Sequence, residues 1–356
     1  MKKELLNKIL EETNSDAILL YSPQNRYWYS RFPSSLGYLI HTKAKTYLFL
    51  DGRYITAARE SEMLINVDEL DTFKNVFESI NRVIKQENIK KVLIESDWVF
   101  VKEAQMFEKR IEANIEVYDF EKVRMIKDEW EVTQIKKACD ITHQVFKDVL
   151  DFVKPGMSET ELARFVSDNF LKHGAQKLSF DTIVASGENG SKPHAVPGER
   201  ILKEGDFITL DMGCYYNGYA SDQTRTFALG NDNNQKLKEI YEIVYNAQQA
   251  GIEAIKPGVL GKEIHKICYD YIENKGYAQY FTHGTGHGLG IEIHEAPYNS
   301  GADSTPLVSG MCVTVEPGIY IPGVGGVRIE DDILVTDNGY EFLTTPFREL
   351  QIVKTK

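Results

Sequence analysis

Five residues between positions 210 and 330 stand in local settings that suit chemistry better than solvation. Carboxylates that share one site repel one another strongly unless cations neutralise them. An imidazole beside several carboxylates is a ligand set that hard divalent cations accept. If these side chains converge in the fold, the sequence predicts a metal centre formed by Asp211 in LDMG, Asp222 in ASDQTRT, His287 in HGTGHGLG, Glu316 in VEPGIY and Glu330 in GVRIED.

An internal repeat gives the reason to expect this convergence. The segment GDFITLDMGCY matches GMCVTVEPGIY at an offset of 105 residues, so that Asp211 falls on Glu316. Lys-Pro-Gly recurs at an offset of 102, HAVP matches HEAP at 100, and Asp222 lies near the position of Glu330 at 108. A frequent helix stop would explain the Lys-Pro-Gly match but not the acids. We therefore predict two similar halves with pseudo-twofold symmetry, each of which contributes ligands to a two-metal centre.

The acids also have structural alternatives. Asp211 ends an apolar run, where it could cap a turn, and Asp222 could be a surface residue of a polar loop. A hairpin turn at Asn217-Gly218 would instead bring the two carboxylates together. Glu330 precedes two further acids and could belong to a solvated strand end. The alternation in VRIE places Arg328 and Glu330 on one face of a strand, where the two could pair.

Four histidines near these acids could act on a metal or a substrate. The glycines around His287 could suggest a phosphate-binding loop, but no Gly-Lys-Ser sequence or helix start follows. Small neighbours more simply allow a close approach of the backbone around a ligand. His194, His283 and His294 flank the expected centre, where they could donate protons or stabilise an oxyanion. The alternative for each is a structural histidine whose hydrogen bonds the fold satisfies.

The composition excludes several classes of function. The chain of 356 residues carries a net charge of −12, whereas nucleic-acid binding requires a basic surface. No stretch approaches the roughly 18 apolar residues of a membrane span, and the N-terminus alternates charged with apolar residues, unlike a signal peptide. Four cysteines are scattered without a CxxC pair, which favours reduced thiols. We expect a cytoplasmic protein that binds neither nucleic acid nor membrane.

The sequence pattern changes near Arg124, which predicts two domains. Residues 1–123 alternate apolar runs with amphipathic segments and lack a nucleotide-binding loop, as in an α/β domain, and Asp71 is expected to cap a helix. Residues 124–356 twice show a helix, Lys-Pro-Gly, a second helix and antiparallel strands, which predicts a duplicated α+β catalytic domain. The strands expected in the first domain cover residues 16–21, 37–41, 46–51, 91–96 and 115–120.

With the five residues in this order, residues 125–350 resemble the pita-bread metallopeptidases, a family of methionine aminopeptidases, Xaa-Pro aminopeptidases and Xaa-Pro dipeptidases (prolidases). The resemblance implies that Asp222 and Glu330 bridge two metal ions and that Glu316 is also the acid/base for the attacking water. The family's metal ligands fall on Asp211, Asp222, His287, Glu316 and Glu330. Its substrate and proton-transfer residues fall on His194, His283, His294 and Arg328.

The same resemblance implies hydrolysis of the peptide bond before proline, assisted by two divalent ions, with Mn²⁺ preferred and Co²⁺ or Zn²⁺ as alternatives. The N-terminal domain resembles that of creatinase and of the proline-specific branch, and residues 34–54 are closer to aminopeptidase P than to prolidase. We therefore expect an Xaa-Pro aminopeptidase for peptides with proline in second position, with a prolidase as the alternative. An inactive peptide-binding homologue is a remoter alternative, which the complete ligand set opposes. Because such appended domains often pack against a neighbouring subunit, we expect a homodimer.

Overall fold

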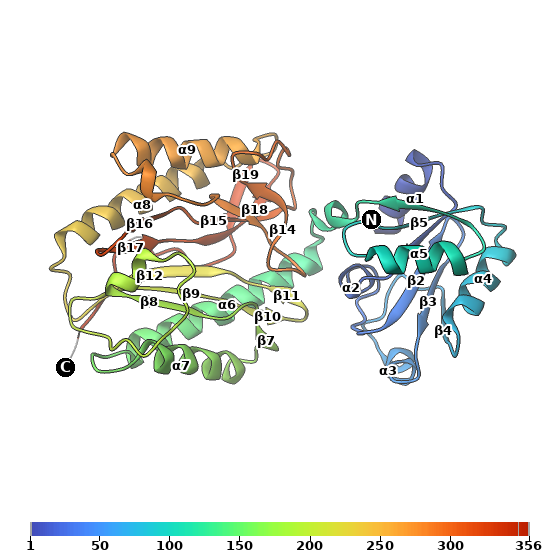
Figure 1. Ribbon diagram of the computed structural model, residues 1–356, viewed down its shortest axis with the longest axis horizontal. Coiled ribbons are helices and arrows are strands. Elements are labelled where there is room, and N and C mark those ends of the chain that lie inside the picture. The colour runs from blue at the N-terminus through green and yellow to red at the C-terminus, as the bar shows by residue number, and fades with distance from the viewer. Residues whose placement is uncertain (1, 348, 355–356) are drawn as a thin grey trace. The chain divides into compact units, whose positions relative to one another are not determined.

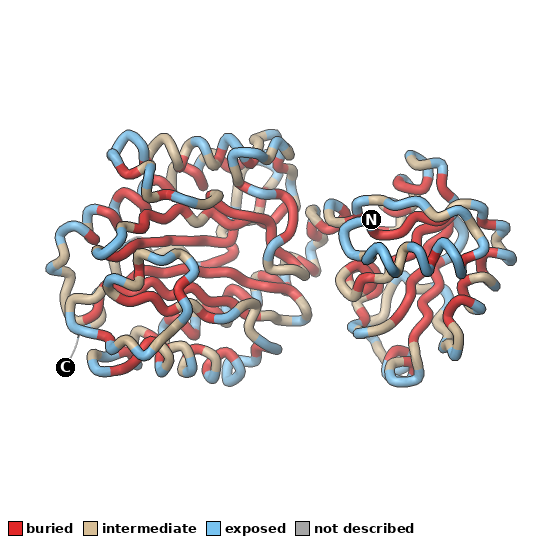
Figure 2. Tube along the Cα trace, viewed as in Figure 1, coloured by how far each residue is buried: buried red, intermediate tan, exposed pale blue. Residues whose placement is uncertain are grey.

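The computed structural model describes residues 2–347 and 349–354. The chain divides into two compact units, Met1–Arg124 and Met125–Lys356 (Figure 1). Buried residues follow most of the strands of both units, and exposed residues concentrate on outer helix faces and loops (Figure 2). Among the described residues, none of the helices combines the length and the apolar character that a bilayer crossing requires.

The first unit is an α/β domain around one mixed sheet with the strand order β4-β3-β2-β1-β5-β6. β2 runs antiparallel to β1 and β3, and the remaining pairs are parallel. β1, β2 and β3 are buried along their whole length because helices pack on both faces of the sheet, as continuous apolar runs require. The elements are α1 (Lys2–Glu12), β1 (Ala17–Leu20), α2 (Pro23–Ser30), β2 (Gly37–Thr42), β3 (Thr46–Leu50), α3 (Ile55–Glu60), β4 (Glu69–Thr72), α4 (Val76–Gln86), β5 (Lys91–Glu95), α5 (Val101–Arg110), β6 (Asn114–Tyr118) and η1 (Glu121–Arg124).

The helix cap expected at Asp71 is wrong. Helix α4 begins at Val76 with Asn75 as its N-cap, whereas Asp71 lies in the edge strand β4 and pairs with Arg82 at 3.0 Å. The sequence did not indicate β4 because its residues, Glu-Leu-Asp-Thr, are mostly polar and none of them is buried. An edge strand with charged side chains needs no apolar alternation to pair with its neighbour.

The second unit consists of two similar halves. In the first half, helices α6 and α7 pack on one face of a sheet with the strand order β20-β12-β9-β8. The edge strand β20 comes from near the end of the chain. The strands β7, β10 and β11 form a separate small sheet with the order β11-β10-β7. The elements of the first half are α6 (Glu129–Phe152), α7 (Glu159–Lys172), β7 (Lys177–Leu178), β8 (Ile183–Ser186), η2 (Gly187–Ser191), β9 (Phe207–Met212), β10 (Cys214–Tyr216), β11 (Tyr219–Ala220) and β12 (Gln223–Leu229).

In the second half, α8 and α9 pack on a sheet with the order β14-β13-β15-β18-β19, next to the hairpin β16-β17. The two halves thus present the same order of two helices followed by antiparallel strands. The remaining elements are α8 (Gln235–Glu253), α9 (Gly261–Asn274), η3 (Ala278–Tyr280), β13 (Gly286–Gly288), β14 (Glu295–Asn299), β15 (Cys312–Val315), β16 (Gly318–Ile321), β17 (Gly325–Arg328), β18 (Asp331–Thr336), β19 (Gly339–Phe342) and β20 (Ile352–Val353).

The repeat in the sequence is also a repeat in the backbone. Gly156 and Gly258, which end the two Lys-Pro-Gly segments, have φ angles of 95° and 92°. Their N–H groups donate to equivalent carbonyls, Gly156 to Leu202 O at 2.9 Å and Gly258 to Leu307 O at 2.8 Å. Other residues are strained at such φ angles, so both halves need glycine there. The predicted pseudo-twofold duplication is therefore confirmed in individual hydrogen bonds.

The strand register corrects one detail of the predicted symmetry. β9 pairs with β12 so that Thr224 lies opposite Asp211. Continued by one residue, the register of β15 and β18 sets Glu330 opposite Glu316. Glu330 therefore corresponds to Thr224 and not to Asp222, which stands two residues earlier, where the chain enters β12.

Candidate metal centre

Strand β9 delivers Asp211 to the interior of the second unit. The alternate apolar residues of this strand pack on α6 and α7, so Thr209 and Asp211 face the other half. Asp211 is buried, and its Oδ2 accepts a hydrogen bond from Arg328 at 2.6 Å. Its Oδ1 is buried without a hydrogen-bond partner in the described part of the chain. The predicted orientation of Asp211 is therefore confirmed, and its Oδ1 is available to a metal ion.

Asp222 reaches the same cavity through a tight hairpin. Asn217 and Gly218, with φ angles of 43° and 73°, connect β10 to β11, as the sequence predicts. The chain then returns toward β9, and the backbone N–H of Asp222 donates to Asp332 Oδ2 at 3.0 Å. Asp211 and Asp222 consequently line one cavity.

His287 lies in β13 with a defined tautomer. Its Nδ1 donates to Gly288 O at 3.0 Å, and because a carbonyl can only accept, Nε2 keeps its lone pair. Nε2 lies 3.6 Å from Asp222 Oδ2 and 3.5 Å from Glu316 Oε1. A β-carbon at Gly286 would overlap the backbone of β15, so the glycine serves strand packing. The glycine-rich segment thus belongs to a sheet, which leaves no phosphate-binding loop there.

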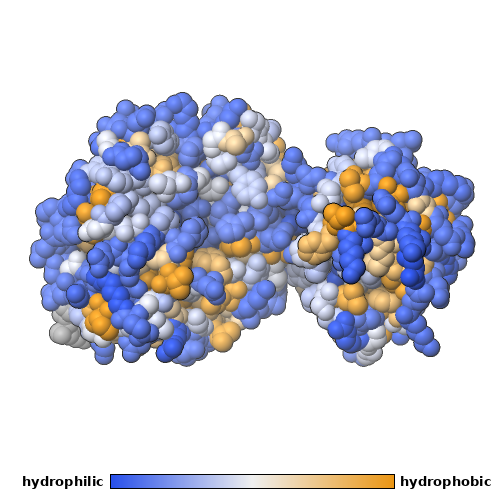
Figure 3. All heavy atoms as spheres, viewed as in Figure 1, coloured by the Kyte–Doolittle hydropathy of each residue, from blue (hydrophilic) through white to orange (hydrophobic). Residues whose placement is uncertain are grey.

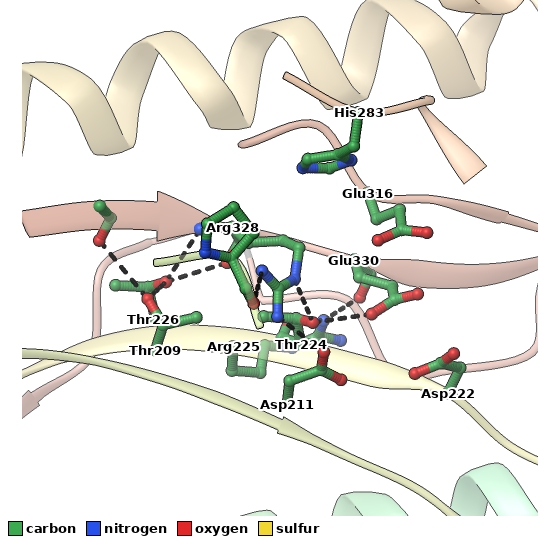
Figure 4. A network of polar contacts seen from close by, with 12 residues as sticks. Thr209, Asp211, Asp222, Thr224, Arg225, Thr226, His283, Glu316, Arg328 and Glu330 are labelled. Atoms are coloured by element: carbon green, nitrogen blue, oxygen red, sulfur yellow. Dashed lines mark hydrogen bonds and ion pairs between the residues drawn. The ribbon is translucent and has the colours of Figure 1, made fainter. Parts of the chain in front are cut away.

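The two glutamates follow strands of the second half. Glu316 comes directly after β15, and Glu330 lies two residues after the end of β17. Thr314 donates to Glu316 Oε1 at 3.4 Å, and Thr224 of the first half donates to Glu330 Oε2 at 2.7 Å. Glu330 Oε1 is buried and lacks a partner among the described residues. Ligand atoms of Asp222, His287 and Glu330 all lie within 4.8 Å of one another. The four carboxylates gather around one space between the strands (Figure 4).

The electrostatics of the centre suit a divalent cation. Burial, and after it the charge of Glu330, raises the pKa of Asp222 well above its ordinary value. Burial and the charge of Glu316 do the same to the pKa of Glu330, and burial raises the pKa of Glu316 to about 7. Burial also lowers the pKa of His287 to about 4, so the imidazole is neutral at neutral pH. Buried carboxylates with unpartnered oxygens and a neutral imidazole fit a divalent metal ion.

Arg328 lies beside the ligands with a partner that differs from the expected one. Its NH2 donates to Asp211 Oδ2 at 2.6 Å, and its Nε donates to Thr224 at 3.0 Å. Glu330, with which it could have paired on one strand face, accepts from Thr224 instead. The reason is that Glu330 stands beyond the end of β17, where the alternation of that strand no longer applies.

His283 is held by Tyr320. Its Nδ1 donates to Gly284 O at 2.7 Å, so its Nε2 accepts from the Tyr320 hydroxyl at 2.8 Å. That hydroxyl accepts in turn from Arg328 NH1 at 2.8 Å. Burial lowers the pKa of His283 to about 4. Because both ring nitrogens have partners within the chain, the geometry favours a supporting role for His283 over direct proton transfer to a substrate.

All nine predicted site residues line one cavity of about 480 Å³. The His294 ring meets that of His287 edge-on, with the centroids 4.4 Å apart, and burial lowers the pKa of His294. His194 enters the cavity from a loop of the first half. The cavity is lined by Asp211, Asp222, His287, Glu316, Glu330, His194, His283, His294 and Arg328, and its other walls include Phe180, Ile183, Pro193 and Tyr298.

Three residues that contact the predicted ligands or their neighbours were not predicted from the sequence. Tyr320 links Arg328 to His283, Thr224 holds Glu330, and Asp332 accepts the backbone N–H of Asp222. Tyr320 falls within the longest repeat, which is a signal that could have identified it. Thr224 and Asp332 act through contacts between the two halves, which no local sequence pattern reveals.

The fold and the site together define a buried metal centre in a duplicated α+β domain that follows an α/β domain. The model of metallopeptidase family M24 matches residues 133–337, and that of the creatinase/prolidase N-terminal domain matches residues 3–126. An Xaa-Pro dipeptidase structure from Bacillus anthracis is 40% identical, covers 99% of both chains and has a TM-score of 0.93. An X-Pro aminopeptidase structure from Thermotoga maritima is 30% identical over 96% of this chain and 98% of its own, with a TM-score of 0.89. An Xaa-Pro dipeptidase of Pyrococcus furiosus is 38% identical over 98% of each chain.

The chain belongs to metallopeptidase family M24. It is a hydrolase of the Xaa-Pro peptidase group within that family, whose members bind divalent metal ions. The predicted resemblance is therefore confirmed, including the creatinase-like N-terminal domain. The relatives include both aminopeptidases and dipeptidases, so the names alone do not choose between these activities.

Proposed function

We propose that this protein is an Xaa-Pro aminopeptidase, a dinuclear metal-dependent exopeptidase that cleaves between an N-terminal residue and proline. The observation that carries the proposal is a single cavity in which the predicted metal ligands face apolar walls. Phe180, Ile183, Pro193 and Tyr298 offer apolar surface to a proline ring and to the residue before it. A cavity of about 480 Å³ suits a short peptide end better than a folded chain.

Two divalent ions would be held by both halves of the second unit. Asp211 and Asp222 come from the first half, and His287, Glu316 and Glu330 from the second. We expect Mn²⁺ because oxygen ligands dominate, with Co²⁺ or Zn²⁺ as alternatives. When bound, the ions supply Lewis acidity that activates a water molecule and polarises the scissile carbonyl.

Glu316 is the residue that we expect to move the proton. The proline nitrogen of the peptide carries no hydrogen, so it must receive one when the bond breaks. Glu316 lines the cavity beside His287, where it can take a proton from the attacking water and pass it to that nitrogen. His194 and His294 face the cavity from different halves and would orient the peptide and stabilise negative charge on the carbonyl oxygen.

The hydrogen bonds of Arg328 in the cavity favour aminopeptidase over dipeptidase activity. A dipeptidase must bind the free carboxylate of its substrate, which an arginine or lysine with free donors does best. Among the described residues, Arg328 is the one arginine or lysine that lines the cavity, and each of its nitrogens has a partner within the chain. Since several relatives are dipeptidases, an Xaa-Pro dipeptidase is the second candidate.

Parallel assays on Ala-Pro and Ala-Pro-Ala with added Mn²⁺ test the proposal. We expect cleavage of the tripeptide between alanine and proline, with slow or absent cleavage of the dipeptide. Cleavage of the dipeptide alone would identify a dipeptidase. Rapid release of methionine from Met-Ala peptides, without a preference for proline, would refute both candidates.

We also infer a homodimer. The first unit exposes large apolar side chains at Trp98, Phe100, Val101 and Val117, with 74% of Phe100 and 76% of Val101 accessible. Figure 3 shows apolar side chains gathered on the visible face of this unit. Large apolar patches on a protein surface often mark a contact with another chain. Sedimentation velocity should give a dimer that the double variant Phe100→Ser/Val101→Ser weakens, and a strictly monomeric wild type would contradict the inference.

A further inference from the structure

The cavity residue His194 lies on an irregular segment between β8 and β9. Within the described part of the chain, no hydrogen bond reaches its ring, and the residue is exposed. It belongs to residues 187–198, which begin with the short helix η2 and otherwise contain no helix or strand. The place of the imidazole therefore depends on how firmly the backbone of this segment is held.

Glu159 holds this segment at both ends. It is the first residue of α7 and is fully buried. Its Oε1 accepts from the backbone N–H and the hydroxyl of Ser186, at 2.9 and 2.6 Å. Its Oε2 accepts from the backbone N–H of Gly198 at 3.2 Å, and Asn189 Nδ2 lies 3.2 Å from both oxygens. One carboxylate thus joins the residue before the segment, a residue within it and its last residue.

Helix α7 does not need Glu159 as a cap. Ser158 accepts from the N–H of Glu161 at 3.1 Å, and Glu161 accepts from the N–H of Ser158 at 2.6 Å, which completes a capping box. The helix N-terminus favours a negative charge at Glu159, so the buried carboxylate is stabilised where it stands. Its hydrogen bonds nevertheless go to Ser186, directly before the segment that carries His194, and to Asn189 and Gly198 within that segment, which separates its role from that of the cap.

The second half of the unit holds the middle of the same segment. A β-carbon at Gly326 in β17 would overlap the carbonyl oxygen of Gly190, so the two backbones are in direct contact. Arg328, at the end of β17, donates its NH1 to Pro193 O at 3.2 Å. His194 is the next residue. The segment is therefore fixed by Glu159 at its ends and by the strand before Glu330 in its middle.

The position equivalent to Glu159 in the second half holds its histidine segment in a different way. At the offset of 102 residues, Glu159 corresponds to Gly261, the first residue of α9. A β-carbon at Gly261 would overlap Tyr298 O, so the segment that follows His294 packs directly on the helix. One half thus fixes its histidine segment by close contact, and the other half fixes it by a buried carboxylate.

We propose that Glu159 is a positioning residue that holds the 187–198 segment so that His194 meets the bound peptide. Glu159 is not among the residues that line the cavity, so its effect on a bound peptide would be indirect. The consequence for catalysis rests on the proposed function, whereas the effect on the segment does not. A displacement of a catalytic group by about 1 Å can reduce a rate by about 100-fold.

The variants Glu159→Ala and Glu159→Gln, with Glu161→Gln as matched control, test this role in the full-length Mn²⁺-loaded protein. Hydrogen–deuterium exchange should accelerate in residues 186–198 of E159A and change little in E161Q. E159Q should lie between them, because a glutamine offers one acceptor oxygen where the carboxylate offers two. Unchanged exchange in both Glu159 variants would overturn the proposal, whatever peptide the enzyme cleaves.

Catalysis supplies the second measurement. E159A should lower kcat/KM for Ala-Pro-Ala by about 10- to 100-fold while calorimetry gives an unchanged affinity for Mn²⁺. In the background of His194→Ala, the same substitution should have little further effect, because Glu159 acts through His194. Additive losses in that double-mutant cycle, or a loss of Mn²⁺ binding in E159Q, would show a merely structural role. If the wild type cleaves no Xaa-Pro peptide, the proposed function fails, and the exchange measurement still decides whether Glu159 holds the segment.

Discussion

Arg225 and Asp331 form a buried ion pair behind the two glutamates of the centre. Arg225 NH2 lies 2.6 Å from Asp331 Oδ1, and the side chains are 4% and 2% exposed. Arg225 NH1 also donates to the backbone carbonyl of Glu330. Gln248 donates both to Asp331 Oδ2 at 3.0 Å and to Val315 O, just before Glu316, at 3.2 Å. The pair therefore fixes the backbone next to both glutamates from the side away from the cavity.

Arg225→Met should be strongly destabilising, because it leaves the Asp331 carboxylate buried without its cation. We expect a loss of about 3–5 kcal/mol in the free energy of unfolding, measured with urea, together with weaker Mn²⁺ binding. Lys136→Met is the control, since Lys136 pairs with Glu341 at the same 2.6 Å but with both side chains more than 40% exposed. That exposed pair should contribute less than about 1 kcal/mol. Equal losses in the two variants would contradict this account.

His287→Ala and Glu316→Gln should each abolish peptide hydrolysis with the fold nearly intact. The first removes the imidazole with a free Nε2, and the second removes the group that we expect to carry the proton. Circular dichroism checks the fold, and elemental analysis checks for a reduced metal content in H287A. His173→Ala, at an exposed pair with Asp148, is the control and should keep wild-type activity. Residual turnover above about 1% in E316Q would argue against its proton-transfer role.

His194→Ala should keep both metal ions but lower the rate by about 100-fold or more, the scale of a lost oxyanion or proton-transfer group. The histidine lines the cavity without contacting a ligand through a hydrogen bond in the described structure. Metal content and kcat measured on the same preparation separate these effects. A wild-type rate would remove His194 from the site.

The metal-free protein should become less stable as pH rises. Burial raises the pKa values of Glu316 and Asp332 to about 7 and those of Asp222 and Glu330 well above their ordinary range. Such carboxyls bind protons more tightly in the folded chain than in the unfolded chain. Their protonation therefore stabilises the folded state fully at a pH below their pKa in the unfolded chain, and this stabilisation disappears as pH rises through about 7. Thermal unfolding after chelation should therefore occur at a lower temperature near pH 8 than near pH 5.5. Mn²⁺ should reverse the trend, because metal ligands must be deprotonated, and an unchanged trend with Mn²⁺ would contradict the metal site.

The sequence was sufficient to predict the structural features that depend on a repeat or an alternation along the chain. The repeat located Asp211 near the end of β9 and Glu316 directly after the equivalent strand β15, and the Asn217-Gly218 turn explained how Asp222 returns to Asp211. The apolar runs located β1, β2 and β3 because these strands are buried on both faces. In each case, a local pattern reflects a local physical requirement.

Features that depend on pairing between distant segments were not accessible in this way. The partner of Arg328 is Asp211, 117 positions away, although Glu330 stands nearby in the sequence. The edge strand β4 has no apolar alternation, so the sequence predicts a helix cap at Asp71 where the structure has a strand. The contacts of Glu159 with residues 186–198 likewise arise only when α7 and the end of β8 meet in the fold.

The predicted metal ligands divide unequally between the two halves of the second unit, with two aspartates in one and a histidine and two glutamates in the other. Neither set alone encloses the cavity, since each half presents its acids across the surface where the halves meet. A single ancestral copy of the repeated unit could have formed such a centre only by pairing with a second copy. The catalytic domain thus has the layout of two similar halves that face each other, joined by the short connection at residues 230–234, and each half contributes different side chains to the shared cavity.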